Sequence, residues 1–251
     1  MRKTAYDADF YSVKSAGSIA SAREILPLVK RYIDPASVVD VGCGTGTWLK
    51  IWRDLGVENV IGIDGDYVDR NKLLIPQERF LSMDLAAPKH LDDQFDLVQS
   101  LEVAEHLPPA SAETFISFLC SLGPVILFSA AIPYQGGTNH VNEQWPAYWA
   151  DLFSRHDYLP FDVIRDHVWD NGKVDRWYAQ NTFLFVKTTK SLPLSPSSSR
   201  SLSRVHPKLW HLKNEQPVPL EKLIPMIPAS ALLFAKTCYH RLKRKFNLPT
   251  K

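Results

Sequence analysis

A short segment in the middle of the chain carries two carboxylates and an imidazole at close spacing. Glu102, Glu105 and His106 occupy positions i, i+3 and i+4, which places all three on one face of a helical turn. Such a group offers a site for Mg²⁺ or Mn²⁺, and an imidazole can also serve as a general base. His140, in a loop that begins with two glycines, is a fourth candidate. Metal binding, base catalysis by His106 or His140, and a purely structural role all remain open for these side chains.

A glycine-rich turn lies upstream of this segment. Val38–Val41 has the composition of a buried strand that contains an acid, Asp40, and Gly42, Gly44 and Gly46 follow at alternate positions. Glycine is needed where the backbone takes positive φ or lies close against a ligand. A turn of this kind at the carboxyl end of a strand is where open α/β sheets bind nucleotide-like ligands.

Acidic residues also stand at the ends of the next two predicted strands. Asp64 ends the run Ile61-Gly62-Ile63, and Asp84 follows Ser82-Met83. Two carboxylate oxygens suit a vicinal diol, because each hydroxyl can donate to one of them. A dinucleotide-binding domain is the rival interpretation, but its G-x-G-x-x-G fingerprint is one residue longer than the segment 42–46.

The glycine turn and the three acids resemble the cofactor site of class I S-adenosylmethionine-dependent methyltransferases, and the resemblance covers about residues 35–190. It implies that Asp40 holds the amino group of the cofactor, largely through water, that Asp64 accepts both ribose hydroxyls, and that Asp84 reads the adenine amino group. The resemblance assigns cofactor binding to Asp40, Gly42, Cys43, Gly44, Gly46, Asp64, Gly65, Met83, Asp84, Leu85, Ser100 and Leu101.

The E-x-x-E-H segment resembles two metal-dependent branches of that superfamily, the ubiquinone-pathway O-methyltransferases and the small-RNA 3′-terminal 2′-O-methyltransferases. In the RNA branch a later histidine completes the metal site, a position that His140 would fill here. The first branch implies methyl transfer to a hydroxyl of a small-molecule, glycan or lipid-linked acceptor, with Glu102, Glu105, His106 and His140 as metal ligands. Two alternatives are a methyltransferase-fold subunit that binds without catalysis and a nucleic-acid methyltransferase.

Strands and helices alternate along the chain, which predicts a doubly wound, mostly parallel sheet. The resemblance makes this a seven-stranded, Rossmann-like methyltransferase fold, with the last two strands joined by a loop and inserted antiparallel at one edge. The expected strands are 38–41, 60–63, 79–82, 95–100, 125–129, 158–165 and 182–186, and the expected helices are 18–33, 46–55, 111–122 and 145–155.

Length and composition fit one domain with an appendage, since 251 residues with 45% hydrophobic content can bury a full core. We expect an N-terminal helical cap over 1–34, a methyltransferase domain over 35–190, a flexible Ser/Pro-rich linker over 191–217 and a basic amphipathic segment over 218–251. The first ten residues do not resemble a signal peptide, and three scattered cysteines fit no disulfide pattern. These features favour a cytoplasmic protein.

Charge is divided unevenly along the chain. Residues 190–251 hold 12 Lys and Arg against two Asp and Glu, whereas residues 1–189 hold 17 against 25. A basic amphipathic helix can lie on an anionic membrane surface, which would place the protein at the inner face of a membrane. Packing of the tail on the domain or on a partner is an equal alternative. The acidic body argues against nucleic acid as a partner.

Overall fold

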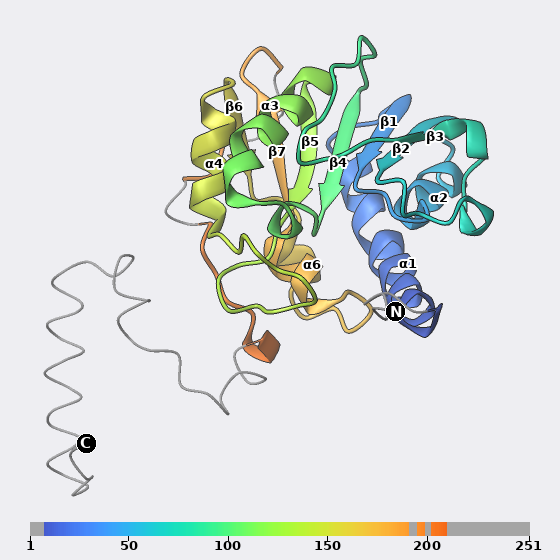
Figure 1. Cartoon of the computed structure of the whole chain (residues 1–251). Helices are drawn as coiled ribbons and strands as arrows, with labels where there is room; N and C mark the ends of the chain where they lie inside the picture. Colours follow the sequence, from blue (N-terminus) through green and yellow to red (C-terminus); the bar gives the residue numbers. More distant parts are fainter. Residues whose placement is uncertain (1–7, 191–194, 199–201, 210–251) are drawn as a thin grey trace, which may run out of the picture. The chain divides into compact units, whose positions relative to one another are not determined.

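The computed structural model describes residues 8–190, 195–198 and 202–209, with side chains from residue 17 onward. Its centre is one seven-stranded sheet in the order β3-β2-β1-β4-β5-β7-β6 (Figure 1). The first five strands run parallel, and β7 runs antiparallel to both β5 and β6. This confirms the predicted doubly wound, mostly parallel sheet. The strands are β1 (Ser37–Val41), β2 (Asn59–Asp64), β3 (Phe80–Ser82), β4 (Leu97–Leu101), β5 (Val125–Ser129), β6 (Tyr158–Phe161) and β7 (Phe183–Lys187).

The central strands are buried on both faces, as their continuous apolar runs require. All five residues of β4 and of β5 are buried. Neighbouring residues point to opposite faces, so Leu97 and Leu127 join one hydrophobic cluster while Val98 and Ile126 join the other. The chain order reverses between β1 and β4, and the crevice beyond the carboxyl ends of these two strands is where such sheets bind ligands.

Helices cover both faces of the sheet. Residues of α1 and α2 belong to the first cluster, and residues of α3 and α4 belong to the second. The first helix is longer than predicted at its N-terminal end, and it ends three residues earlier. The helices are α1 (Ala8–Lys30), α2 (Thr47–Asp54), α3 (Ala112–Leu122), α4 (Pro146–Ser154), α5 (Arg165–Val168) and α6 (Arg176–Asn181).

The connection between β6 and β7 contains α5 and α6, so the prediction of a plain loop there was wrong. Both helices are too short to show a periodic pattern, and short helices depend on tertiary contacts. Those contacts are present: Tyr178 packs edge-on against Trp48 at 5.0 Å, and the Ser18 and Tyr178 hydroxyls are 3.3 Å apart. The tight packing of α6 against α1 and α2 therefore compensates for its short length.

The described residues beyond β7 lie against the domain. The Ser197 amide donates to the carbonyl of Pro160 in β6 (2.8 Å), and the Leu202 side chain is fully buried. The buried Arg165 guanidinium donates to the Leu202 carbonyl (2.7 Å), and the His206 amide donates to Gln180 Oε1 (2.7 Å). We call residues 202–209 the C-terminal strap; it belongs to the segment predicted as a linker.

The predicted basic segment 218–251 lies outside the described residues. Within the described part of the chain, no helix is long and apolar enough to span a bilayer.

Candidate active site

The glycine turn follows β1 in a left-handed conformation that favours glycine. Gly42, Gly44 and Gly46 all have positive φ, at 87°, 53° and 80°. A Cβ on Gly42 would lie 2.3 Å from Cγ2 of Val103, so this position also requires glycine for close packing. The amides of Gly42 and Cys43 donate to the carbonyl of Ile63 (2.7 and 3.2 Å). The turn is thereby fixed to the end of β2.

Asp64 joins the end of β2 to the glycine turn. Its side chain is only 4% exposed. Oδ2 accepts a hydrogen bond from the Gly44 amide and Oδ1 accepts one from the Gly65 amide, both at 2.7 Å. Oδ1 also accepts from the hydroxyl of Tyr67, a residue that sequence reasoning did not identify.

Asp40 is buried in β1 behind the same turn. Burial raises the pKa of its carboxyl to about 7, the negative charge of Asp64 adds to the rise, and the Gln99 side chain opposes it. Gln99 is itself oriented by the indole N–H of Trp52, which donates to its Oε1 at 3.1 Å. Two buried carboxyls close together favour a ligand that brings positive charge.

The remaining cofactor candidates extend along the same edge of the sheet. Asp84 is exposed, and its Oδ1 accepts from the Ala86 amide (2.9 Å). The Met83 amide donates to the Asp64 carbonyl (2.8 Å), which ties the residues after β3 to the end of β2. Leu85, Ser100 and Leu101 are buried near this edge. Burial also raises the pKa of the Cys43 thiol, which makes a thiolate unfavourable there.

The second cluster of predicted site residues forms beyond β4. Glu105, His106 and His140 each present a ligand atom, and these three atoms lie within 4.8 Å of one another. The two imidazole rings meet edge-on, with centroids 4.8 Å apart. The structure thus unites residues from two separate loops, one after β4 and one after β5, as the sequence predicted.

The expected single helical face for this cluster is not observed. Only Ala104–His106 forms a turn, of the 3₁₀ type, and Glu102 precedes it with a positive φ of 55°. The Glu102 amide is drawn to β5, where it donates to the Ser129 carbonyl and Oγ at 2.9 and 3.0 Å. Because Glu102 still extends the sheet ladder, it cannot share the turn of Glu105 and His106.

Glu105 is the most unusual side chain of the cluster. It is fully buried, and within the described residues neither carboxylate oxygen makes a hydrogen bond of normal geometry. Burial raises the pKa of Glu105 well above its usual value, and repulsion from Glu102 raises it further. A buried carboxyl without compensating partners must stay protonated or acquire a positive charge nearby.

Glu102 differs from Glu105 because amide groups hold it. Its Oε2 accepts from the Gln135 side chain (2.8 Å) and its Oε1 from the Asn181 side chain (3.1 Å). Burial raises the pKa of Glu102, while these hydrogen bonds lower it. Gln180 bonds to Asn181 (2.9 Å) and also accepts from the C-terminal strap. Sequence reasoning missed both amide partners, since no spacing or motif links Asn181 to a segment so far away.

His140 is oriented by a residue three positions later. Its Nδ1 lies 2.9 Å from Oε1 of Glu143, and the amides of Tyr134 and Gly136 donate to the same carboxylate (2.7 and 2.6 Å). Although burial opposes ionisation of Glu143, these hydrogen bonds lower its pKa. With Nδ1 engaged, Nε2 remains to accept a proton or a cation, and Gly137 leaves room beside it. The i, i+3 spacing of His140 and Glu143 is a signal that could have identified this pair.

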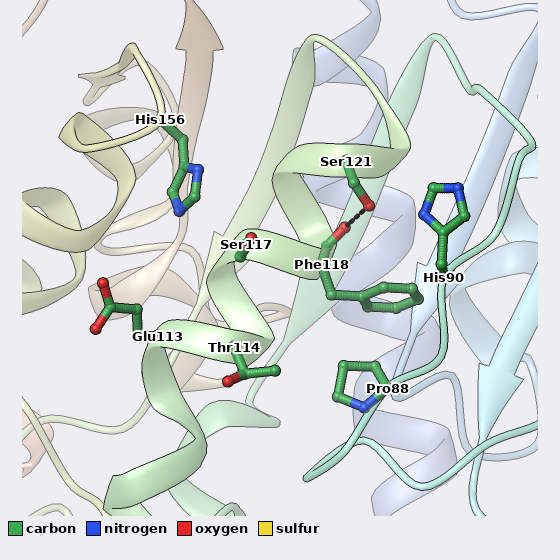
Figure 2. Close-up of a pocket in the computed structure, with 8 residues that line it drawn as sticks. All are labelled: Pro88, His90, Glu113, Thr114, Ser117, Phe118, Ser121 and His156. Carbon is green, nitrogen blue, oxygen red and sulfur yellow. Dashed lines mark hydrogen bonds between the residues drawn. The ribbon is translucent and has the colours of Figure 1, made fainter.

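An open pocket elsewhere on the domain contains none of these residues. It lies along the outer side of α3, between Pro88 and His90 on one side and His156 on the other (Figure 2). Glu113, Ser117 and other α3 side chains form its floor. The sequence-predicted site therefore lies at the carboxyl ends of the strands, away from this pocket.

Comparison with known sequences decides the family. Residues 18–156 match the profile of a family described as a methyltransferase domain, which is more than half of the chain. The chain belongs to the class I S-adenosylmethionine-dependent methyltransferases. No curated protein matches the sequence of this methyltransferase.

Solved structures share the fold at low sequence identity. A Haloferax volcanii methyltransferase, in complex with the Trm112 activator, is 14% identical with a TM-score of 0.52, over 73% of this chain and 99% of that chain. An O-methyltransferase family protein from Burkholderia thailandensis is 14% identical with a TM-score of 0.51, over 71% of this chain and 57% of that chain. The methyltransferase domain of a bacterial protein, CtHen1, is 16% identical with a TM-score of 0.50, over 70% of this chain and 98% of that chain. At these identities the likeness establishes the fold of the methyltransferase alone.

Proposed function

We propose that this methyltransferase transfers a methyl group from S-adenosylmethionine to a hydroxyl of a small-molecule, glycan or lipid-linked acceptor. In this proposal, Asp40 faces the amino group of the cofactor, Asp64 accepts hydrogen bonds from its ribose diol, and Asp84 binds its adenine. Support comes from two buried acids behind a turn that has no Cβ atoms at Gly42, Gly44 and Gly46. Such a cradle suits a cationic ligand that carries a sugar diol.

The observation that carries the choice of a hydroxyl acceptor is the buried, unsatisfied Glu105 carboxyl beside two imidazoles. One carboxylate and two imidazoles suit a divalent transition-metal ion such as Mn²⁺ better than Mg²⁺, which prefers oxygen ligands. His106 and His140 would be the nitrogen ligands. A bound cation would compensate the charge of Glu105 and lower the pKa of an acceptor hydroxyl. Glu102 lies beside Glu105 and is a further oxygen ligand if it leaves its amide partners.

The protein's own residues set the geometry of the transfer. Methyl transfer from a sulfonium is an in-line displacement, so most of the rate enhancement comes from positioning. Glu143 fixes the ring of His140 and leaves Nε2 as the atom that can take up the hydroxyl proton. Gln135 and Asn181 hold Glu102 at the end of β4, beside the expected place of the sulfonium.

Calorimetric titration tests the proposal in two steps. The purified chain is titrated with S-adenosylhomocysteine, and then with Mn²⁺ after treatment with EDTA. We expect S-adenosylhomocysteine to bind with micromolar affinity. We expect Mn²⁺ binding to be lost in Glu105→Gln and retained in Glu113→Gln, a matched change on the exposed surface of α3.

Each other outcome contradicts a specific part of the proposal. Cofactor binding without any Mn²⁺ binding would exclude the proposed metal site and leave only the role of His140 as a base. Mn²⁺ binding that survives Glu105→Gln would place the ion elsewhere. No binding of S-adenosylhomocysteine by a folded chain would favour a non-catalytic subunit.

A further inference from the structure

Tyr67 combines an exposed ring with an anchored hydroxyl. The residue is 71% exposed, yet its hydroxyl donates to Asp64, which is almost completely buried. The ring lies over Gly65, where a Cβ would come 2.2 Å from Cε1 of the tyrosine. The chain turns tightly here, with the Val68 amide 3.3 Å from the Gly65 carbonyl. The absence of a side chain at residue 65 thus makes the space that the ring occupies.

The Asp64 carboxylate has nearly all of its acceptor capacity in use. A carboxylate offers about four lone-pair positions. Three are taken, by the amides of Gly44 and Gly65 and by the Tyr67 hydroxyl. The two amides belong to the glycine turn and to the end of β2, so they cannot leave without disrupting both. The Tyr67 hydroxyl, at the end of an exposed side chain, is the donor that can be exchanged.

A ribose diol brings two donors to a carboxylate that has roughly one free position. We propose that the Tyr67 hydroxyl occupies the place of one ribose hydroxyl on Asp64, and that the cofactor must displace it to bind through both. This inference rests on the proposed binding of S-adenosylmethionine. Tyr67 is then a residue that sets cofactor affinity by competition, because one hydroxyl on Asp64 is exchanged for another.

The experiment compares Tyr67→Phe with the unchanged chain by calorimetric titration with S-adenosylhomocysteine. The variant keeps the ring over Gly65 and removes only the competing hydroxyl. We expect it to bind about three- to tenfold more tightly, since a hydrogen bond to a charged group no longer has to be broken. Tyr32→Phe is the matched control. It changes a half-buried tyrosine that precedes β1, at the opposite edge of the sheet, and should leave affinity unchanged.

A second ligand makes the test specific to the diol. The 2′,3′-dideoxy analogue of S-adenosylhomocysteine brings no hydroxyl to Asp64 and does not need to displace Tyr67, so Tyr67→Phe should change its affinity less than twofold. Equal or weaker binding of S-adenosylhomocysteine by Tyr67→Phe would overturn the inference, as would an equal gain for both ligands. If wild type and Tyr67→Phe both fail to bind, the proposed cofactor itself is wrong, and displacement is excluded with it.

Discussion

Protonation of Asp40 should control cofactor affinity near neutral pH. The carboxyl has a pKa of about 7 because it is buried and close to the negative charge of Asp64. In the proposed site, its ionised form is the one that attracts the cationic amino group of S-adenosylhomocysteine. Binding of a cation lowers this pKa, so binding below pH 7 must release a proton from Asp40. The affinity therefore falls as the pH falls through about 7.

The size of the effect follows from the fraction of ionised Asp40. At pH 6 roughly one chain in ten carries the carboxylate, whereas at pH 8 roughly nine in ten do. If only this form binds well, Kd should rise about tenfold from pH 8 to pH 6, which corresponds to about 1.4 kcal/mol. Asp40→Asn carries a neutral side chain of the same shape at every pH. It should bind weakly at pH 8 and show almost no dependence on pH.

Calorimetric titration with S-adenosylhomocysteine between pH 6 and 8 measures both effects. Repeating the titration in buffers with different ionisation enthalpies counts the protons released, and the count should approach one below pH 7 and vanish at pH 8. A flat Kd in the unchanged chain would refute the assignment of Asp40 to the amino group. A pH dependence that persists in Asp40→Asn would show that another group is responsible.

Three further predictions concern Glu105, the C-terminal strap and the basic tail. Burial raises the pKa of Glu105, so the folded protein loses stability as the pH rises above the pKa that Glu105 has in the unfolded chain. Glu105→Gln should therefore raise the Tm measured by calorimetry in EDTA at pH 8, while Glu113→Gln should not. Leu202→Ala truncates a fully buried side chain and should cost about 2–5 kcal/mol in urea unfolding; the same change at the exposed Val205 should cost under about 0.5 kcal/mol, and equal costs would contradict docking of the strap. Vesicles with anionic lipid should carry the full chain in flotation, but not a variant with glutamate at positions 243–245, and binding by both or by neither would argue against a membrane role of these charges.

The sheet and its ligand-binding edge could be predicted because they depend on local pattern. Buried parallel strands leave unbroken apolar runs such as Val125–Ser129, and the glycine turn requires positive φ at fixed places. Asp40 and Asp64 could be identified from the same pattern, because Asp40 interrupts the apolar run of β1 and Asp64 ends that of β2. The proximity of His140 to Glu105 could be predicted in the same way, since the two residues follow the neighbouring parallel strands β5 and β4.

The contacts that complete the cluster could not be predicted in this way. Asn181 lies 79 positions after Glu102 in the sequence, and the tertiary packing of α6 brings the two together. This helix is too short to have a periodic signature. Tyr67 is an exposed aromatic residue with no signal in the sequence pattern, and only the fold brings its hydroxyl to Asp64. Both cases depend on side-chain direction, which spacing along the sequence does not determine.

The backbone of Glu105 also shapes the loop that faces its side chain. Its carbonyl accepts hydrogen bonds from the amides of Val141 and Asn142 (2.9 and 3.0 Å), directly after His140. The residue that most needs a positive partner thus fixes the position of the imidazole that approaches it. These two hydrogen bonds fix the loop that carries His140 to the backbone of Glu105.

The two neighbouring glutamates have different surroundings, and this difference assigns their roles. Glu102 is held by two side-chain amides, whereas Glu105, within the described chain, has hydrogen bonds to its carbonyl but none of normal geometry to its carboxyl. Two like charges at such close range do not both ionise without compensation. An arriving cation therefore gains most by contact with Glu105, and Glu102 has to give up its hydrogen bonds to follow. We infer that Glu105 is the primary oxygen ligand, so that Glu105→Gln should weaken Mn²⁺ binding more than Glu102→Gln does.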